Sequence, residues 1–367
     1  MEKSNRISII GTRGIPSVYG GFETFAEEIS VLLTRAGYDV TVQCDKDSCA
    51  GDTFRGVKLY ISRYSKNRNP VLYYYDGIRW ATRYTDIIVI TGSAGSPFYI
   101  LNLFRKKVLI TNVDGIEYRR SKWTRYKKLY LFLTELISVV SRGIIIADSS
   151  AIRDHLVKRY GKMVSRKIRV IEYGAYPNNK VNEKILSGFS LVSFKYYLVV
   201  CRLEPENNVD MIINGYLLSG TKLPLVIVGN LLDNPYVRKL TQTDRSGRVV
   251  FLGGIYDKEA LMALRSGCYA YIHGHSVGGT NPSLLEAMAN GNIALCHDNV
   301  FNREVTGEKQ FYFSDSWSCS DQIIRIEAMK DDELDQYHKA SSSMILDKYS
   351  WDKILEKYCN LFDSVLP

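Results

Sequence analysis

The chain has 367 residues, which is long enough for two domains of ordinary size. Hydrophobic residues make up 46% of it and charged residues 24%, a composition that excludes an intrinsically disordered protein. The net charge of +9 is unevenly distributed, because residues 101–170 hold seventeen Lys and Arg against five Asp and Glu.

The pattern of apolar residues and cysteines predicts a cytosolic protein. No long apolar segment precedes the first predicted strand, so we expect no secretory signal. Glu135 and Arg142 interrupt the longest apolar stretch, residues 129–148, which is therefore typical of a helix followed by a strand. Seven cysteines without Cys-x-x-Cys spacing indicate reduced thiols, and the five histidines have no metal-ligand spacing, so we expect no structural zinc.

Strands and helices alternate from the N-terminus onward. Residues 6–10 form an apolar strand that ends in a glycine turn, and Gly20 and Gly21 precede a helix with apolar residues at helical spacing. The turn lacks the GxGxxG pattern, so the fingerprint of a dinucleotide site is absent. This order predicts a parallel sheet with crossover helices. Further strands are predicted at residues 39–43, 86–91, 107–112, 143–148 and 168–172.

A polar segment at residues 176–183 separates this series from a second one. The second set of strands is predicted at residues 196–200, 223–229, 248–252, 268–273 and 293–297. A final helix follows at 350–362, with Ser350 as its N-cap. The sequence therefore predicts an α/β protein of two Rossmann-like domains, residues 1–178 and 190–349, followed by a C-terminal helix within 350–367.

Residues 273–291, HGHSVGGTNPSLLEAMANG, combine a strand end, a glycine turn and a helix start. Pro282 suits the first helical position, and Asn281 or Thr280 can cap the helix. Such a helix start directs free N–H groups and a positive dipole end at one point, where an anion such as a phosphate binds. Glu286, one turn later, can accept hydrogen bonds from a sugar hydroxyl. An ordinary strand–helix connection with a surface Glu explains the local pattern equally well.

The same stretch resembles the donor-site motif of retaining GT-B glycosyltransferases of family 4, Glu-x7-Glu followed by Ala-hydrophobic-Ala-x-Gly. Glu286 matches the second Glu, but Gly278 stands where the family has the first, which contacts the donor sugar. The wording GGTNPSLLEAM, together with IIGTRGIPSVYGGFETF at residues 9–25, resembles a rhamnosyltransferase-type subgroup of bacterial polysaccharide (O-antigen or capsule) synthesis.

The resemblance implies a GT-B fold, in which two Rossmann-like domains face a cleft and the last helix crosses back onto the N-terminal domain. It implies retaining, metal-independent transfer of a sugar from a dTDP- or UDP-linked donor, with rhamnose from dTDP-rhamnose as our choice. The acceptor would be a saccharide carried on a polyprenyl diphosphate. Two alternatives remain, namely a sugar-nucleotide epimerase of the same architecture and a basic nucleic-acid-binding or anion-binding protein with a vestigial donor cleft.

The resemblance also assigns roles to individual residues. Arg202 resembles the Arg of the family's Gly-Arg-Leu segment, which would bind the diphosphate, although a surface ion pair is the commoner role of such an Arg. The family usually adds a Lys a few residues later, where this chain has Asn207. We expect the donor to contact Gly20, Gly21, Gly253, Gly254, Ile255, His273, Gly279, Thr280, Asn281, Pro282, Ser283 and Glu286.

The acceptor is expected near turns that follow strands in the N-terminal half. Asp114, which could orient a hydroxyl or accept its proton, is as easily explained as a helix cap. Asp114 joins Arg202 and Glu286 as a predicted catalytic residue. The remaining residues predicted on the acceptor side are Glu23, Glu117 and Arg119.

We expect neither a metal ion nor a cofactor beyond the donor, because no Asp-x-Asp motif stands at a strand end; the nearest match is Asn208-Val209-Asp210. The basic segment 101–170, with its interleaved aromatic residues, could meet nucleic acid, an anionic membrane surface or a phosphate-bearing substrate. Of these we expect a peripheral protein on the anionic cytoplasmic face of the cell membrane, and no binding to nucleic acid. A solvated helix face would explain the same charges.

Overall fold

A computed structural model describes residues 6–17, 20–47, 49, 51–113, 124–178, 180–244 and 246–365. The chain divides into two compact units, one of Met1–Tyr173 with Trp351–Pro367 and the other of Gly174–Ser350. Residues 174–178, which we assigned to the first domain, belong to the second unit. The reason is that they form backbone hydrogen bonds with that unit, since Ala175 N donates to Tyr349 O and Asn178 N donates to Ala289 O.

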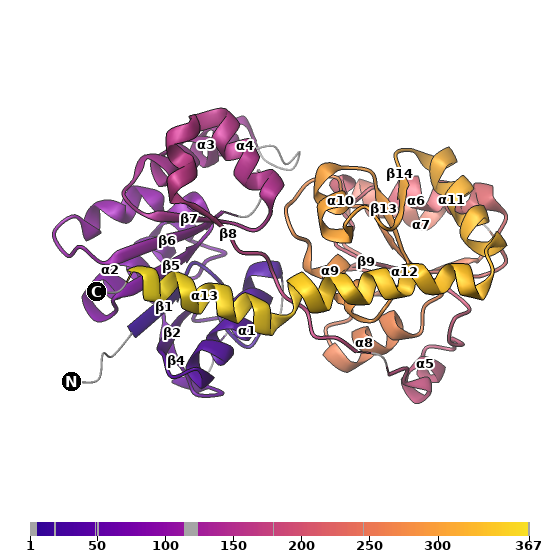
Figure 1. The fold of residues 1–367 in the computed structure, drawn as a ribbon, viewed down its shortest axis with the longest axis horizontal. Helices are drawn as coiled ribbons and strands as arrows, with labels where there is room; N and C mark the ends of the chain where they lie inside the picture. Colours follow the sequence, from indigo (N-terminus) through magenta and orange to yellow (C-terminus); the bar gives the residue numbers. More distant parts are fainter. Residues whose placement is uncertain are drawn as a thin grey trace. The chain divides into compact units, whose positions relative to one another are not determined.

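The first unit contains an eight-stranded sheet in the order β3-β4-β2-β1-β5-β6-β7-β8, parallel except for the β3–β4 pair (Figure 1). The strands predicted in this half are present, whereas β3, with two residues, and β4, with an exposed Lys58 among its apolar residues, were missed. The strands are β1 Arg6–Ile10, β2 Asp39–Cys44, β3 Thr53–Phe54, β4 Val57–Ile61, β5 Ile87–Thr91, β6 Val108–Val113, β7 Ile144–Ala147 and β8 Ile168–Val170.

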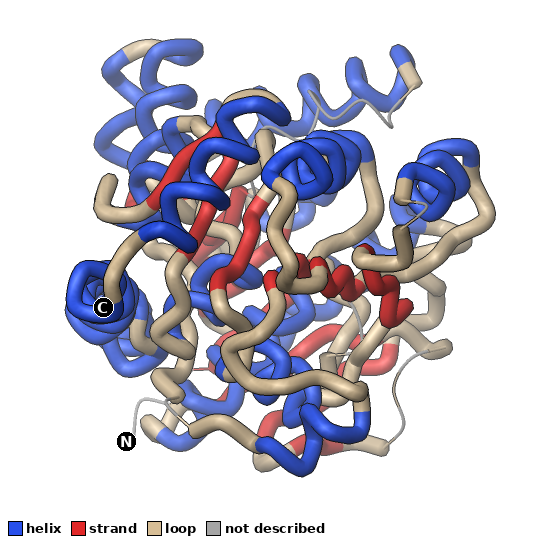
Figure 2. The backbone as a smooth tube through the Cα atoms, turned by 90° about the vertical axis from the view of Figure 1, so that its right-hand side faces the viewer, coloured by secondary structure: helices blue, strands red, loops and turns tan. Residues whose placement is uncertain are grey.

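Helices connect β1 to β2 and each strand from β4 onward to the next. Figure 2 distinguishes the helices, in blue, from the strands, in red, along the described chain. β5 is buried along its whole length, which explains its continuous run of β-branched residues. The helices of this unit are α1 Gly21–Arg35, α2 Pro70–Tyr84, the 3-10 helix η1 Ser93–Asn102, α3 Arg125–Val140, α4 Ser150–Tyr160, the 3-10 helix η3 Lys162–Lys167 and α13 Trp351–Val365.

The C-terminal helix α13 completes the first unit by packing on α1 (Figure 1). The helix was predicted from an apolar stripe at Trp351, Ile354, Leu355, Tyr358 and Phe362, of which all but the partly exposed Leu355 are buried. The ring centroids of Phe25 on α1 and Tyr358 lie 5.7 Å apart, and Lys357 Nζ donates to the buried carboxylate of Glu172. The last helix is therefore part of the N-terminal core.

The second unit contains a six-stranded parallel sheet in the order β11-β10-β9-β12-β13-β14. All five strands predicted in this half are present, and only β14 was missed. The strands are β9 Tyr197–Val200, β10 Leu225–Val228, β11 Val249–Gly253, β12 Ala270–His273, β13 Ala294–His297 and β14 Phe311–Phe313.

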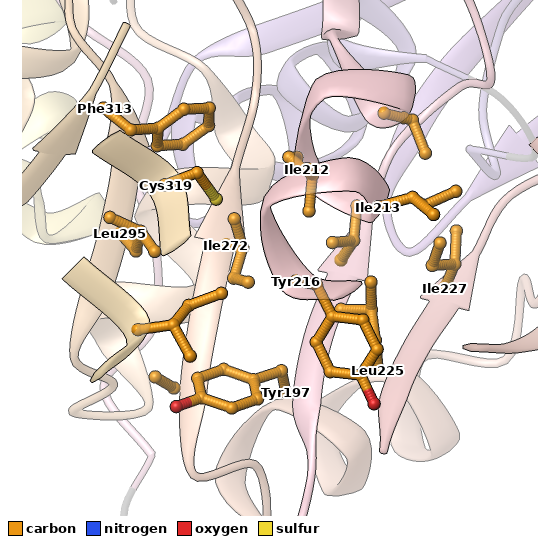
Figure 3. Packing of buried hydrophobic residues seen from close by; sticks show 14 of the residues in the cluster. Tyr197, Ile212, Ile213, Tyr216, Leu225, Ile227, Ile272, Leu295, Phe313 and Cys319 are labelled. Carbon is orange, nitrogen blue, oxygen red and sulfur yellow. The ribbon is translucent and has the colours of Figure 1, made fainter. Parts of the chain in front are cut away.

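Helix α6 and the strands beneath it enclose the core of this unit. Figure 3 shows Ile212, Ile213 and Tyr216 of α6 facing Leu225, Ile227 and Ile272 of the sheet, all of them fully buried. The helices are α5 Glu183–Gly188, the 3-10 helix η4 Pro205–Asn207, α6 Val209–Ser219, α7 Pro235–Thr243, α8 Lys258–Ser266, α9 Pro282–Ala289, α10 Val300–Thr306, α11 Ser316–Ala328, α12 Asp331–Met344 and the π-helix η5 Ile345–Tyr349.

Within the described part of the chain, no helix combines the length and the apolar character that crossing a bilayer requires.

Candidate functional site

The carboxyl ends of β9, β11 and β12 lie at one edge of the second sheet because the three strands are parallel. In open α/β sheets this edge is where ligands bind. The turns after these strands carry the residues that the sequence analysis assigned to the donor.

Arg202 follows β9 and extends toward solvent, with 43% of its side chain exposed and its Nη1 3.8 Å from Glu204 Oε1. Asn207, at the position of the family's Lys, is buried, and its Nδ2 donates to Arg202 O over 2.7 Å. The amide therefore has a structural role, since it fixes the backbone that carries Arg202. It supplies no second positive charge.

The loop after β9 is joined to the loop after β12 by three hydrogen bonds. Asn208 Nδ2 donates to Gly274 O over 2.8 Å, and Ser276 donates both its N–H and its hydroxyl to Glu206 O. These bonds tie together two segments that are far apart in the sequence. The polar groups on both loops are thus held at the same place on the sheet edge.

Helix α9 starts where the sequence predicted, with Pro282 in its first turn and Asn281 Oδ1 accepting from Ser283 N over 3.0 Å. The Ser283 hydroxyl donates to Val200 O at the end of β9 over 2.8 Å and lies 2.6 Å from the Tyr271 hydroxyl. The first turn of α9 is therefore fixed two residues from Arg202. Gly279 and Thr280, just before the helix, are buried.

Glu286 is paired with a residue that the sequence analysis missed. Its Oε2 lies 2.6 Å from Nη2 of Arg265 in the last turn of α8, whose side chain is only 6% exposed, whereas Glu286 is 37% exposed. Asn292 Nδ2 donates a hydrogen bond to the backbone carbonyl of Arg265. The buried guanidinium orients the carboxylate and leaves part of it accessible to a ligand. Only the tertiary packing of α8 against α9 brings the two residues together.

Gly278, which replaces the family's first Glu, has a φ of +144°, and a Cβ built on it would have open space around it. A side chain there would strain the backbone although it would not clash. The chain therefore lacks this Glu because its loop follows a path that favours glycine.

His273 ends β12 as a buried residue, and neither of its ring nitrogens has a hydrogen-bond partner among the described residues. Its ring stacks on that of His275, with centroids 4.3 Å apart. Burial, with smaller contributions from His275 and His297, lowers the pKa of His273 well below its ordinary value. The imidazole is therefore neutral at pH 7.

The turn after β11 holds Gly253, Gly254 and Ile255, which the sequence analysis assigned to the donor. Gly253 has a φ of +74°, and Gly253 O accepts from Gly229 N over 2.9 Å. A Cβ on Gly254 would come within 1.9 Å of Asn230 Oδ1, so a side chain at this position would require the Asn230 amide to move. Ile255 is partly exposed directly after the turn.

In the first unit, Gly20 is the N-cap residue of α1 and Gly21 is its first helical residue. Glu23 is 7% exposed, and its Oε1 accepts from Arg13 N over 3.0 Å and lies 4.0 Å from Lys66 Nζ. This carboxylate stabilises the turn after β1. Its predicted contact with an acceptor stays a prediction.

The other predicted acceptor residues, Asp114, Glu117 and Arg119, lie outside the described residues. Just before them, at the carboxyl end of β6, the sequence analysis overlooked Asn112. Its side chain is buried, and neither of its polar atoms has a hydrogen-bond partner in the described part of the chain. Within the same described residues, no group of three or more His, Cys, Asp or Glu side chains is arranged to hold a metal ion.

Comparison with solved structures identifies the fold. The chain is similar to sucrose-phosphate synthase from Thermosynechococcus elongatus, with a TM-score of 0.79, 14% identity and 98% coverage of both chains. It is also similar to HepE of Anabaena in complex with UDP and glucose, with a TM-score of 0.78, 14% identity and coverage of 98% of this chain and 100% of that one. A glycosyltransferase from Rickettsia africae covers 99% of both chains at 15% identity and a TM-score of 0.73. The expected GT-B fold is confirmed.

Two family models match the sequence. Residues 4–176 match a family described as "Domain of unknown function (DUF1972)", and residues 190–347 match "Glycosyl transferases group 1". The second unit therefore contains a glycosyl transferases group 1 domain, and this domain together with the fold supports glycosyltransferase activity. A comparison with curated proteins gives no match.

Proposed function

We propose that the protein is a retaining glycosyltransferase that transfers rhamnose from dTDP-rhamnose to a lipid-linked saccharide during the synthesis of a cell-surface polysaccharide. One observation carries the proposal. The Ser283–Val200 hydrogen bond fixes the start of α9 two residues from Arg202. The positive end of a helix dipole and a guanidinium therefore lie at the carboxyl end of the same strand, β9. Such a combination suits a diphosphate.

In this proposal the second unit holds the donor in three parts. Arg202 and the first turn of α9 bind the diphosphate and stabilise the charge that develops on it as it leaves. Glu286, oriented by Arg265, accepts hydrogen bonds from the ribose hydroxyls. The backbone at Gly253–Ile255 contacts the base. The structures of HepE in complex with UDP and with UDP-glucose support a nucleotide sugar as the donor.

Transfer with retention then proceeds by attack on the face of the sugar from which the diphosphate departs. The bond between the anomeric carbon and the acceptor oxygen forms as the bond to the diphosphate oxygen breaks. The acceptor proton passes to the departing phosphate, so no side chain needs to act as the nucleophile. Diphosphate stabilisation by the protein is therefore the main catalytic contribution.

The choice of rhamnose depends on the motif wording at residues 9–25 and 278–288, which resembles the rhamnosyltransferase-type subgroup. A lipid-linked acceptor is what the same resemblance implies, and the basic segment 101–170 supports a place on the cytoplasmic face of the membrane. Both extend the activity that the family match and the fold support.

The direct test measures thermal stabilisation by a panel that contains dTDP-rhamnose, UDP-glucose and other nucleotide sugars. A donor present at about 100 times its Kd adds about 2.7 kcal/mol to the free energy of unfolding. The stabilising donor is then incubated with a lipid-linked saccharide, and release of nucleoside diphosphate is measured. Stabilisation by a different sugar nucleotide would refute the rhamnose assignment alone. Conversion of the donor to an isomer without release of nucleoside diphosphate would identify an epimerase instead.

A further inference from the structure

Helix α3, in the first unit, exposes a continuous apolar stripe that no described element covers. The stripe consists of Tyr126, Leu129, Leu133, Ile137 and Val140. Their spacing of three and four residues places the five side chains within about 80° of one another around the helix axis. Tyr126 is 88% exposed and Val140 is 67% exposed, so the stripe is open at both ends of the helix.

The opposite face of α3 is firmly attached to its own unit, so the stripe is not the result of a detached helix. Thr134 O accepts from Ser96 Oγ over 2.7 Å, and the Tyr130 hydroxyl donates to Ala94 O over 2.8 Å. Leu131 and Val139 are buried. Helix α3 is therefore apolar on two faces, of which one forms the core and the other faces solvent.

A second group of exposed apolar residues lies on the neighbouring element. Helix η1 packs against α3 and carries Ile100 in its last turn, and Leu103 and Phe104 follow the helix; all three are well exposed, Phe104 almost completely. Surfaces of soluble monomers rarely carry so many large apolar side chains on adjoining elements, and those that do are commonly interaction sites.

The charges beside the stripe have one sign. Arg125 lies in the first turn of α3, Arg142 lies two residues beyond its end, and Arg105 and Lys106 follow Phe104. The one acidic residue of α3, Glu135, is buried on the opposite face, where its Oε1 accepts from the Tyr160 hydroxyl. An apolar stripe with basic flanks is the pattern of a helix that lies in the interface of an anionic bilayer.

We propose that the α3 stripe inserts into the headgroup region of an anionic membrane while the flanking Arg and Lys bind lipid phosphates. A second copy of the chain fits less well, because pairing two stripes would bring their basic flanks together. The inference rests on the proposed function, which places the protein at the membrane, and deepens it by naming the surface that binds lipid; lipid binding by α3 itself requires neither donor nor acceptor. It differs from purely electrostatic attraction because the apolar side chains enter the hydrocarbon boundary.

The test compares four forms of the full chain in sedimentation with phosphatidylcholine vesicles that contain or lack phosphatidylglycerol. Leu129→Gln/Leu133→Gln removes apolar surface from α3 without changing its charge. Leu218→Gln/Ile324→Gln is the matched control, because these residues are similarly exposed but lie on α6 and α11. Arg125→Gln/Arg142→Gln removes charge at the two ends of the stripe. Circular dichroism and unfolding temperature verify that all forms are folded.

The wild type and the control are expected to bind the anionic vesicles, and the stripe variant to bind them at least about tenfold more weakly. In about 0.5 M NaCl, where screening is strong, wild-type binding should fall but remain above that of the stripe variant. The charge variant should lose binding mainly at low salt.

Equal binding by wild type and stripe variant at either salt concentration would overturn the proposal. A wild-type dimer that the stripe variant dissociates, without binding to vesicles, would show that a second copy covers the stripe. Donor turnover on a detergent-solubilised acceptor is measured in parallel. Absent vesicle binding with normal turnover in the wild type would refute the α3 inference alone. Absent turnover with normal vesicle binding would refute the proposed function alone.

Discussion

Glu286 and Arg265 show how one residue of a site depends on another that the sequence does not connect to it. Replacement of Glu286 by Gln is expected to weaken donor binding and activity while the fold is retained, because the amide oxygen can still accept from the Arg265 guanidinium. Replacement by Ala should also lower the free energy of unfolding by about 1–2 kcal/mol, because it leaves a buried guanidinium unpaired. Donor titration and denaturant unfolding measure the two effects.

The matched control is Glu259→Gln on α8, an exposed carboxylate whose loss should change neither quantity. Full activity with unchanged donor affinity in Glu286→Gln would contradict the ribose assignment.

His273 makes the stability of the second unit depend on pH. Its folded-state pKa is lowered by burial, so the unfolded state binds more protons as the pH falls below about 6.5, the ordinary value of His. Stability is therefore complete above pH 6.5 and decreases below it, by up to about 1.4 kcal/mol per pH unit. His273→Phe, which preserves a ring beside His275, should flatten this decrease in unfolding experiments between pH 7.5 and 5.5.

Part of the decrease should remain in His273→Phe, since the pKa of His297 is also lowered by burial. The same pH profile in wild type and variant would show that His273 does not cause it.

The sequence predicted the positions of Arg202, Glu286 and the α9 cap because each lies in a local pattern of strand end, turn or helix start. It did not predict Arg265 or the role of Asn207. The Arg265–Glu286 pair depends on how α8 packs against α9, and the Asn207–Arg202 bond depends on the path of a loop. Neither contact is encoded by spacing along the chain.

At the level of elements, substitutions in α13 test how much this helix contributes to the stability of the first unit. Phe362 is fully buried, and its ring centroid lies 5.7 Å from that of Tyr358 and 5.9 Å from that of Tyr38. Phe362→Ala should lower the free energy of unfolding by about 3–5 kcal/mol because it leaves a cavity in the core. Glu356→Ala, at an exposed position of the same helix, should change it by less than about 0.5 kcal/mol.

A loss for Phe362→Ala as small as that for Glu356→Ala would mean that α13 contributes little to this core. The sequence predicted α13 well, because an apolar stripe at helical spacing is a strong signal. It failed for β3 and β14, because two or three residues give too few alternations to recognise, and for the inner strand β4, which interrupts its apolar residues with the exposed Lys58.

For the molecule as a whole, activity in excess chelator is expected to persist. In the segment nearest to an Asp-x-Asp motif, both polar side chains are engaged in hydrogen bonds within the protein. The Asn208 amide donates to Gly274 O, and Asp210 accepts from the Tyr236 hydroxyl. Release of nucleoside diphosphate with and without a chelator is the measurement. Strict dependence on added Mg²⁺ or Mn²⁺ would mean that an ion, and not Arg202 with α9, neutralises the diphosphate.

The arrangement of two α/β units was predictable at this scale because two series of apolar strands flank a polar segment. The boundary between the units was less predictable. Residues 174–178 belong to the second unit through pairing with Tyr349 and Ala289, which lie more than a hundred residues further along the chain.

The discontinuity of the first unit has a consequence for the order in which the chain can fold during synthesis. Residues 351–365 leave the ribosome only after all of Gly174–Ser350, yet they cover Phe25 on α1. Because domains fold as units once their residues are available, the second unit can reach its native state first. Until then, the part of the first unit that has been synthesised lacks α13, and the apolar surface that α13 covers stays exposed. During this interval it is the part of the nascent protein most in need of a chaperone.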